Sequence, residues 1–125
     1  MTLIRKTFLH RCALALTLVV AVTQAHAAGA LAIDSNQGDQ YGFAYNHAST
    51  AQADQRALSE CGQGCQIVMR FSGSCAAYAA DQSRGSTAYG WGTASSAGAA
   101  QNRALSECRS RGNACMVRVW GCDNR

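Results

Sequence analysis

The chain carries the same six residues twice. Arg56–Cys61 and Arg103–Cys108 both read Arg-Ala-Leu-Ser-Glu-Cys, and the second block begins 47 residues after the first. The match continues on both sides of these blocks, with the following pairs at corresponding places: Tyr41-Gly42-Phe43 and Tyr89-Gly90-Trp91, Asp34 and Asp81, Phe71 and Trp120, Cys75 and Cys122. The sequence therefore predicts one duplicated unit, with repeat one at about residues 30–73 and repeat two at about residues 75–122.

Residues 1–27 have the features of a secretory signal peptide. Three basic side chains open the segment, an apolar run follows from Cys12 to Val22, and Ala25-His26-Ala27 forms a small-x-small cleavage site. The run is too short for a membrane span, which needs about 20 residues. No cysteine follows it at the expected cut, so we expect no lipid anchor. The segment predicts export, cleavage near Ala27 and a mature protein in the periplasm or the medium.

Removal of this segment changes the charge of the chain. The whole sequence has a formal net charge of +4, from eleven Lys and Arg against seven Asp and Glu. Arg5, Lys6 and Arg11 leave with the signal and no acidic residue does, so the mature chain has eight Arg, no Lys and a net charge of about +1. Nucleic acid and anionic lipid attract strongly basic proteins. We therefore expect neither as a partner.

Six cysteines remain once Cys12 is removed: Cys61, Cys65, Cys75, Cys108, Cys115 and Cys122. An even number in a short exported chain predicts three disulfides. The competing interpretation is a metal site, because Cys61-x3-Cys65 has the form of half a zinc knuckle. Its partner would be Cys108-x6-Cys115, whose spacing suits a tetrahedral site poorly. We expect disulfides, and neither a metal nor a cofactor.

The duplication narrows the fifteen pairings that six cysteines allow. A symmetric pattern joins Cys61 to Cys65 and Cys108 to Cys115, so that each helix end is tied to the strand after it. Cys75 then pairs with Cys122 and joins the ends of the two copies. This pattern is the simplest that the repeat allows, and the asymmetric pairings stay open.

Each repeat reads as strand, strand, helix, strand. Ser49 and Ser96 stand where helices would begin, and glycines at 62, 64 and 112 stand where they would end. The mature chain, residues 28–125, is long enough for one domain only. We expect an α+β fold in which two ββαβ repeats form one antiparallel-rich sheet, with both helices packed on one face and three disulfides stapling the whole. The pairs Arg56–Glu60 and Arg103–Glu107 would then be exposed i,i+4 ion pairs on the helices.

The residues that carry catalysis in other proteins form no recognisable set here. His47 is the one histidine of the mature chain, and a hydrolase would need it to act as a base with a carboxylate and a nucleophile nearby. The second copy has no histidine in that region, so the plainer interpretation is a loop residue. A pair of carboxylates in a glycosidase cleft is a further alternative. We expect a protein that is not an enzyme.

The final strand offers the more suggestive surface. Met116, Arg118 and Trp120 alternate with two valines, so Arg118 and Trp120 would project together if the valines face the core. Trp and Arg dominate the binding hot spots of protein interfaces. Arg70, in the corresponding strand of the first copy, would extend this patch. The alternative is that Trp120 belongs to the core and Arg118 is an isolated surface charge.

Taken together, the Tyr-Gly-Phe and Tyr-Gly-Trp strands, the two Ala-Leu-Ser-Glu-Cys helix ends and the terminal Val-Trp-Gly-Cys resemble one bacterial family, the domain of unknown function 4189. The resemblance covers the chain from about Ala30 to Cys122. It implies a small exported or lipid-anchored protein, and some members are immunity proteins against antibacterial effectors. This sequence lacks the lipid-attachment cysteine of the anchored members.

These observations lead to one expected function and one alternative. We expect a non-catalytic, exported binding module whose partner is a protein, with an exported antibacterial effector as the specific candidate and neutralisation of that toxin as the role. The alternative is a small secreted hydrolase that uses His47 with a carboxylate. The candidate binding residues are Arg70, Arg118 and Trp120.

Overall fold

The computed structural model describes residues 27–34 and 39–123. The predicted signal peptide up to residue 26, the centre of the first predicted turn (35–38) and residues 124–125 lie outside the described residues. The elements follow in the order β1 (Ala28–Asp34), β2 (Tyr41–His47), α1 (Thr50–Cys61), β3 (Cys65–Phe71), β4 (Cys75–Asp81), β5 (Tyr89–Ala94), α2 (Ala97–Arg109) and β6 (Cys115–Cys122). Each copy thus has the predicted strand, strand, helix, strand order.

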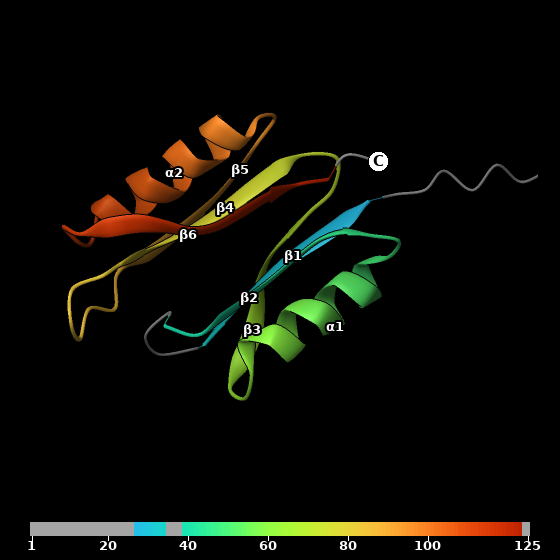
Figure 1. The fold of residues 1–125 in the computed structure, drawn as a ribbon, viewed down its shortest axis with the longest axis horizontal. Coiled ribbons are helices and arrows are strands. Elements are labelled where there is room, and N and C mark those ends of the chain that lie inside the picture. The colour runs from blue at the N-terminus through green and yellow to red at the C-terminus, as the bar shows by residue number, and fades with distance from the viewer. Residues whose placement is uncertain (1–26, 35–38, 124–125) are drawn as a thin grey trace, which may run out of the picture.

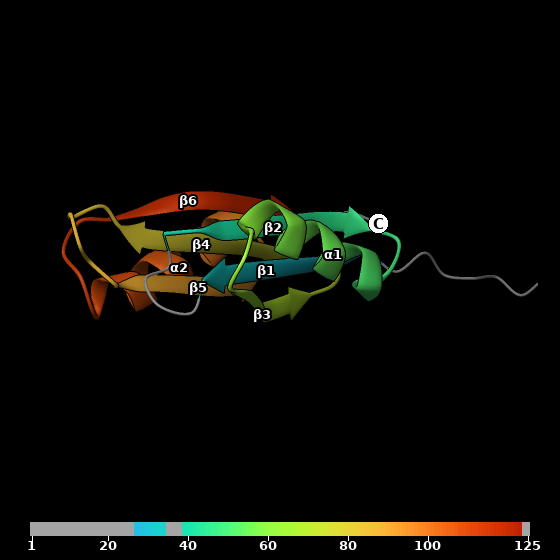
Figure 2. The ribbon, with the colours of Figure 1, turned by 90° about the horizontal axis from the view of Figure 1, so that it is seen from below.

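The strands form two antiparallel sheets of three strands, one from each copy. The first has the order β2-β1-β3 and the second has the order β5-β4-β6, so equivalent strands hold equivalent places. The sheets face each other, with α1 outside the first and α2 outside the second (Figure 1). The strands of both sheets run along one long axis (Figure 2). The prediction of one sheet with both helices on the same face is wrong, because the described strands form two sheets with a helix on each outer face.

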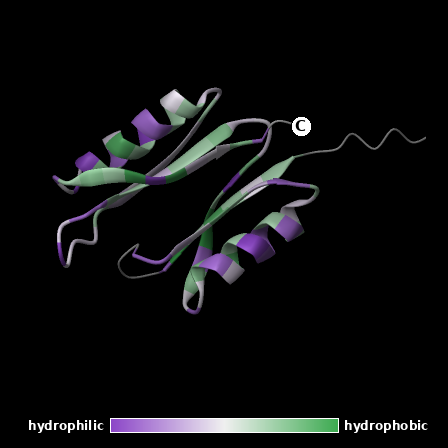
Figure 3. Ribbon diagram, viewed as in Figure 1, coloured by the Kyte–Doolittle hydropathy of each residue, from purple (hydrophilic) through white to green (hydrophobic). Residues whose placement is uncertain are grey.

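The side chains of the central strands explain this four-layer arrangement. In β1, Ala30 and Ala32 pack against α1, whereas Leu31 and Ile33 point to the other side. Both sets are buried, so the strand needs a layer on each of its faces. The inner cluster is completed from the second copy, chiefly by Tyr78 of β4. Apolar residues accordingly follow the strands, and hydrophilic residues are frequent on the helices (Figure 3).

Both helices begin at the predicted caps. The Ser49 hydroxyl accepts a hydrogen bond from the Gln52 N–H at 3.2 Å, and Ser96 accepts one from Ala99 N–H at the same distance. Such a side chain satisfies one of the backbone donors that every helix start leaves unpaired. α1 ends at Gly62, whose φ of 100° favours glycine.

Glycine in β5 allows α2 to approach the sheet closely. A Cβ placed on Gly90 would lie 2.5 Å from the Ala104 carbonyl oxygen and 2.5 Å from the Cys108 nitrogen, both in α2. The helix offers small side chains to the sheet, with Ala100 and Ala104 fully buried. Close helix-on-sheet packing therefore replaces the bulky side chains that usually fill such an interface.

The six cysteines form the three disulfides Cys61–Cys65, Cys75–Cys122 and Cys108–Cys115. These are the pairs of the symmetric pattern. Two of them tie a helix end to the next strand, and Cys75 and Cys122 are register partners at the ends of β4 and β6. Three disulfides fit a protein of an oxidising compartment, such as the periplasm or the extracellular medium.

Candidate protein-binding surface

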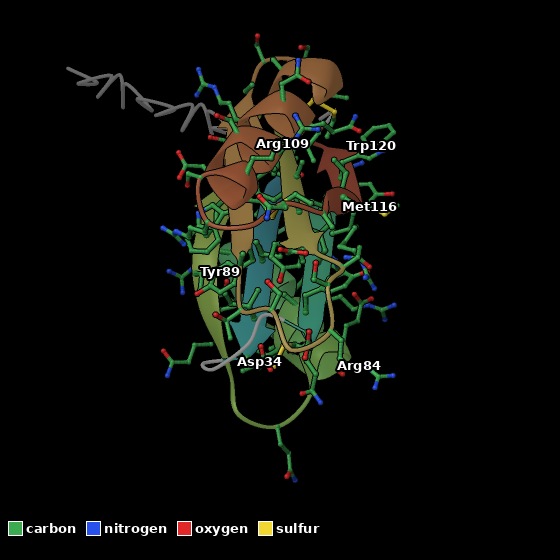
Figure 4. All side chains as sticks on the ribbon, turned by 90° about the vertical axis from the view of Figure 1, so that its left-hand side faces the viewer. Asp34, Arg84, Tyr89, Arg109, Met116 and Trp120 are labelled. Carbon is green, nitrogen blue, oxygen red and sulfur yellow. A yellow bond between two sulfur atoms is a disulfide. The ribbon has the colours of Figure 1, made fainter. Side chains whose placement is uncertain are left out.

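Three of the exposed large apolar side chains lie on β2 and β6, the two strands that are in contact across the sandwich. Met116 is 58% exposed and Trp120 is 50% exposed, both on β6, and Tyr45 of β2 is 48% exposed. Met116 and Trp120 point away from the body of the protein on the same side (Figure 4). Trp120 is therefore a surface residue and not part of the core, which settles the alternative left open by the sequence.

Tyr45 reaches the seam between these two strands because residue 121 is glycine. A Cβ on Gly121 would stand 2.7 Å from Tyr45 Cδ1 and 2.9 Å from a ring carbon of Phe43. The missing side chain lets the aromatic rings of β2 lie directly against β6, next to Trp120. We call Tyr45, Met116, Arg118 and Trp120 the β2–β6 surface.

Arg118 holds a fixed position at the same seam. It is the extra residue of a bulge in β6, because Val117 and Val119 pair with consecutive residues of β4. Its guanidinium carbon lies 5.8 Å from the centre of the Tyr41 ring, and its Nη1 donates to Gln82 Oε1 at 2.7 Å. The bulge turns Arg118 toward the opposite sheet. Trp120, as the register partner of Ala77, is on the side of β6 that faces α2.

Arg70 does not join this surface. β3 is the edge strand of the first sheet farthest from β2, so it lies on the other side of the sandwich from the β2–β6 seam. The Arg70 guanidinium forms hydrogen bonds to both oxygens of Asp54, the shortest at 2.9 Å. The hydrogen bond and charge of Asp54 raise the pKa of Arg70. The expected three-residue patch is thus divided between two edges.

His47 lies at the end of β2, near the carboxylate of Asp123. Asp123 is 6% exposed, and its Oδ1 accepts a 2.7 Å hydrogen bond from the Asn46 N–H. Its Oδ2 has no hydrogen-bond partner among the described residues. Burial raises the pKa of Asp123, and the Asn46 hydrogen bond and the nearby His47 charge oppose that shift.

Sequence reasoning missed Asp123 as a neighbour of His47. The two residues are far apart in the chain, and they meet because the ends of β2 and β6 lie together across the sandwich. Within residues 27–34 and 39–123, no group of three or more His, Cys, Asp or Glu side chains is arranged to hold a metal ion.

Comparison with known proteins identifies one family. The model of a family described as a domain of unknown function, DUF4189, matches residues 28–122. The chain belongs to the DUF4189 family. No curated protein and no solved structure matches this DUF4189 protein. Among its described helices, neither has the length and apolar character needed to span a membrane.

Proposed function

We propose that this DUF4189 protein is an exported, non-catalytic binding module for another protein. The observation that carries the proposal is Trp120, a half-exposed indole on a strand that a disulfide holds in place. Large aromatic side chains contribute much of the binding energy of protein interfaces. An anchor on a rigid frame also loses little conformational freedom when it binds, which reduces the cost of association.

The other side chains of the β2–β6 surface support the same role. Tyr45 and Met116 add exposed apolar area, and Arg118 is held over the Tyr41 ring with much of its side chain in the open. Interface cores are enriched in Tyr, Trp, Met and Arg, and these are the residue types of the β2–β6 surface. The specific partner we propose is an exported antibacterial effector, which the protein neutralises after signal-directed export to the periplasm or medium.

The test compares three forms of the tagged, exported protein as bait for periplasmic and secreted proteins. Trp120→Ala should weaken binding of the captured partner about 5- to 30-fold, the factor that corresponds to 1–2 kcal/mol. Leu58→Ala is the matched control, because Leu58 is the exposed apolar residue of α1, away from the seam. It should bind like the wild type, and neither variant should melt differently. The purified partner should lose its toxic activity when the wild-type protein is added.

Equal binding by wild type and Trp120→Ala would remove the β2–β6 surface from the proposal. A captured partner that keeps its full toxicity in the complex would instead remove the neutralising role. The two results are separable because the first concerns affinity and the second concerns activity of the bound partner.

The alternative is a small secreted hydrolase, and the proximity of His47 to Asp123 favours it over other catalytic readings. A carboxylate beside a histidine can orient the ring and stabilise its charged form. His47→Ala separates the two functions. The binding proposal expects partner affinity and toxin neutralisation to stay within about twofold, whereas a loss of activity above about tenfold with an unchanged melting temperature would favour the hydrolase.

A further inference from the structure

The outer edges of β2 and β5 hold equivalent places but have different partners. The N–H of Asp81 donates to the Ala88 carbonyl, which makes them a hydrogen-bonded pair. The N–H and C=O groups of successive residues point to opposite edges of a strand. Those of Gly90 and Gly92 therefore bond to β4, and those of Tyr89, Trp91 and Thr93 point outward. The same alternation in the first copy directs Phe43 outward from β2.

In the first copy this edge is occupied. The Phe43 N–H donates to Glu60 Oε2 at 3.4 Å, and Arg56 Nε binds the other oxygen of Glu60 at 2.7 Å. The strand also lies against β6, which is why Tyr45 is in contact with the Gly121 position. The expected Arg56–Glu60 pair is thus present, and it holds the carboxylate over the strand edge.

The same six residues behave differently in the second copy. Arg103 Nη1 donates to the Thr93 carbonyl at 3.0 Å instead of pairing with Glu107. Glu107 has no ion pair within the described part of the chain, and the Trp91 N–H, which corresponds to that of Phe43, has no acceptor there. Apart from the Thr93 carbonyl, the outward backbone groups of Tyr89, Trp91 and Thr93 therefore have no partner among the described residues.

A groove of about 680 Å³ runs along this free edge. Every residue from Tyr89 to Thr93 lines it, so the groove follows the strand and is not confined to one point. Met69 and Arg70 of β3 form one wall, and α2 forms the other. An extended chain rises about 3.3 Å per residue, so a segment of about five residues matches this stretch of β5. The groove lies on the opposite edge from the β2–β6 surface, as the place of Tyr89 shows (Figure 4).

Aromatic rings and arginines give the groove a chemical preference. The Tyr89 and Trp91 rings are stacked, with centroids 5.8 Å apart and planes at 15°. Of the three arginines in the walls, Arg70 is already paired with Asp54, whereas Arg103 and Arg111 have no ion pair among the described residues. The lining contains one carboxylate, that of Glu107. The charge in excess is therefore positive, and it favours an acidic side chain in the occupant.

We propose that the β5 edge binds an extended, acidic peptide segment of a partner protein, which adds to the second sheet as a fourth strand. Main-chain hydrogen bonds to the outward groups of Tyr89 and Trp91 and to the Thr93 N–H would give affinity, and the aromatic pair and Arg111 would give selectivity. This inference rests on the proposed protein-binding function. It names a second contact surface and the chemistry of the segment bound there.

The probe is a hexapeptide of alternating Val and Glu, titrated into the ¹⁵N-labelled exported protein. The amide signals of Tyr89, Trp91 and Thr93 should shift together and saturate. A peptide of the same sequence with alternate amide nitrogens methylated should bind at least tenfold more weakly, because it cannot form the ladder. An alternating Val and Lys peptide should also bind more weakly, and added salt should reduce this difference.

Two variants assign the binding to the edge itself. Thr93→Pro removes an outward N–H that forms no internal hydrogen bond, a place where an edge strand tolerates proline. It should abolish peptide binding, whereas Thr93→Val, which keeps the N–H, should not. If Thr93→Pro does not fold, Arg111→Glu is the second variant, and it should lower affinity for the acidic peptide and raise it for the basic one.

Three results would overturn the inference: no shift at the β5 amides up to the solubility limit of the peptide, equal binding of the methylated peptide, or concentration-dependent dimerisation that shifts the same amides without peptide. The last would identify a second copy of the chain as the occupant. Trp120→Ala should leave peptide binding unchanged. Partner capture that depends on Trp120 but occurs without peptide binding would reject this inference and keep the proposed function.

Discussion

The backbone N–H of Asn46 donates a 2.7 Å hydrogen bond to Asp123 Oδ1, and this contact joins the end of β2 to the residue that follows β6. Asn46 has a φ of 58°, in the left-handed region that asparagine tolerates better than most residues. The bond fixes the two strand ends that carry Tyr45 and Trp120. The geometry of the β2–β6 surface thus depends on one buried carboxylate.

Asp123→Asn should raise the melting temperature at pH 7. Burial raises the pKa of Asp123, so its contribution to stability is present below the unfolded pKa of about 3.9 and is lost as the pH rises through the folded value. Asparagine keeps the acceptor for Asn46 and removes the buried charge. The gain should shrink between pH 7 and pH 3, which thermal melts of both proteins would measure. A variant that is less stable at pH 7 would contradict the prediction.

Tyr78 should stay protonated in alkaline solution until the protein unfolds. The side chain is fully buried, and burial raises the pKa of its phenol well above the usual value, with a further rise from the Asp34 charge. The stability that depends on the neutral phenol is complete below pH of about 10 and is lost as the pH rises through the folded pKa. The part of the phenolate absorbance that comes from Tyr78, one of four tyrosines, should therefore appear together with the change in circular dichroism, and Tyr78→Phe should remove that part. A phenolate step that precedes unfolding and is lost in Tyr78→Phe would count against burial.

Gly90→Ala should destabilise the protein strongly, because the new Cβ would collide with the backbone of α2 at two points 2.5 Å away. We expect a cost of more than about 2 kcal/mol, in the range for overpacked cores. Gly98→Ala in α2 is the matched control, because a Cβ at that position would have no neighbouring atom within 4 Å. It should stabilise by about 0.5–1 kcal/mol. Chemical denaturation measures both, and a neutral Gly90→Ala would show that the helix can move away from the sheet.

All six mature cysteines should resist alkylation before reduction. Among the three disulfides, Cys75–Cys122 spans 47 residues and Cys61–Cys65 spans 4. In the loop-entropy account, replacing the first pair by alanine should cost about 4 kcal/mol and replacing the second about 2 kcal/mol. Mass spectrometry after alkylation tests the first statement and denaturation of the double variants tests the second. Two or more free thiols, or stoichiometric zinc, would refute the disulfide assignment.

Local features of the fold were predictable, and features that depend on how the sheets meet were not. Ser49 and Ser96 cap their helices as their positions indicate, because capping needs only the residues of one helical turn. The sequence did not predict the four layers, because Ala30–Ile33 is a continuous apolar run and not an alternation of apolar and polar residues. Such a run shows burial on both faces but not which layers cover them.

The candidate surfaces show the same limit. The sequence left Trp120 either exposed or in the core, because the alternation of side chains along a strand does not show which face is covered. Tyr45 entered the surface only through its contact with the Gly121 position, in the other copy. The β5 groove had no sequence signal of its own. Arg103 and Arg56 lie in identical six-residue blocks, and the difference between their partners appears only in three dimensions.

Neither repeat contains all the residues of the hydrophobic core between the sheets. The inner face of the first sheet, with Leu31 and Phe71, is covered by Tyr78 and its neighbours from the second. One repeat produced alone would leave that face in water, and a second copy of itself is the surface most similar to the missing half. A single-repeat ancestor is therefore expected to have been a homodimer with a two-fold axis through the present interior. Fusion of the two copies would have made folding independent of concentration. It would also have allowed Phe43 and Trp91 to differ, because in a homodimer one residue has to occupy both of these equivalent positions.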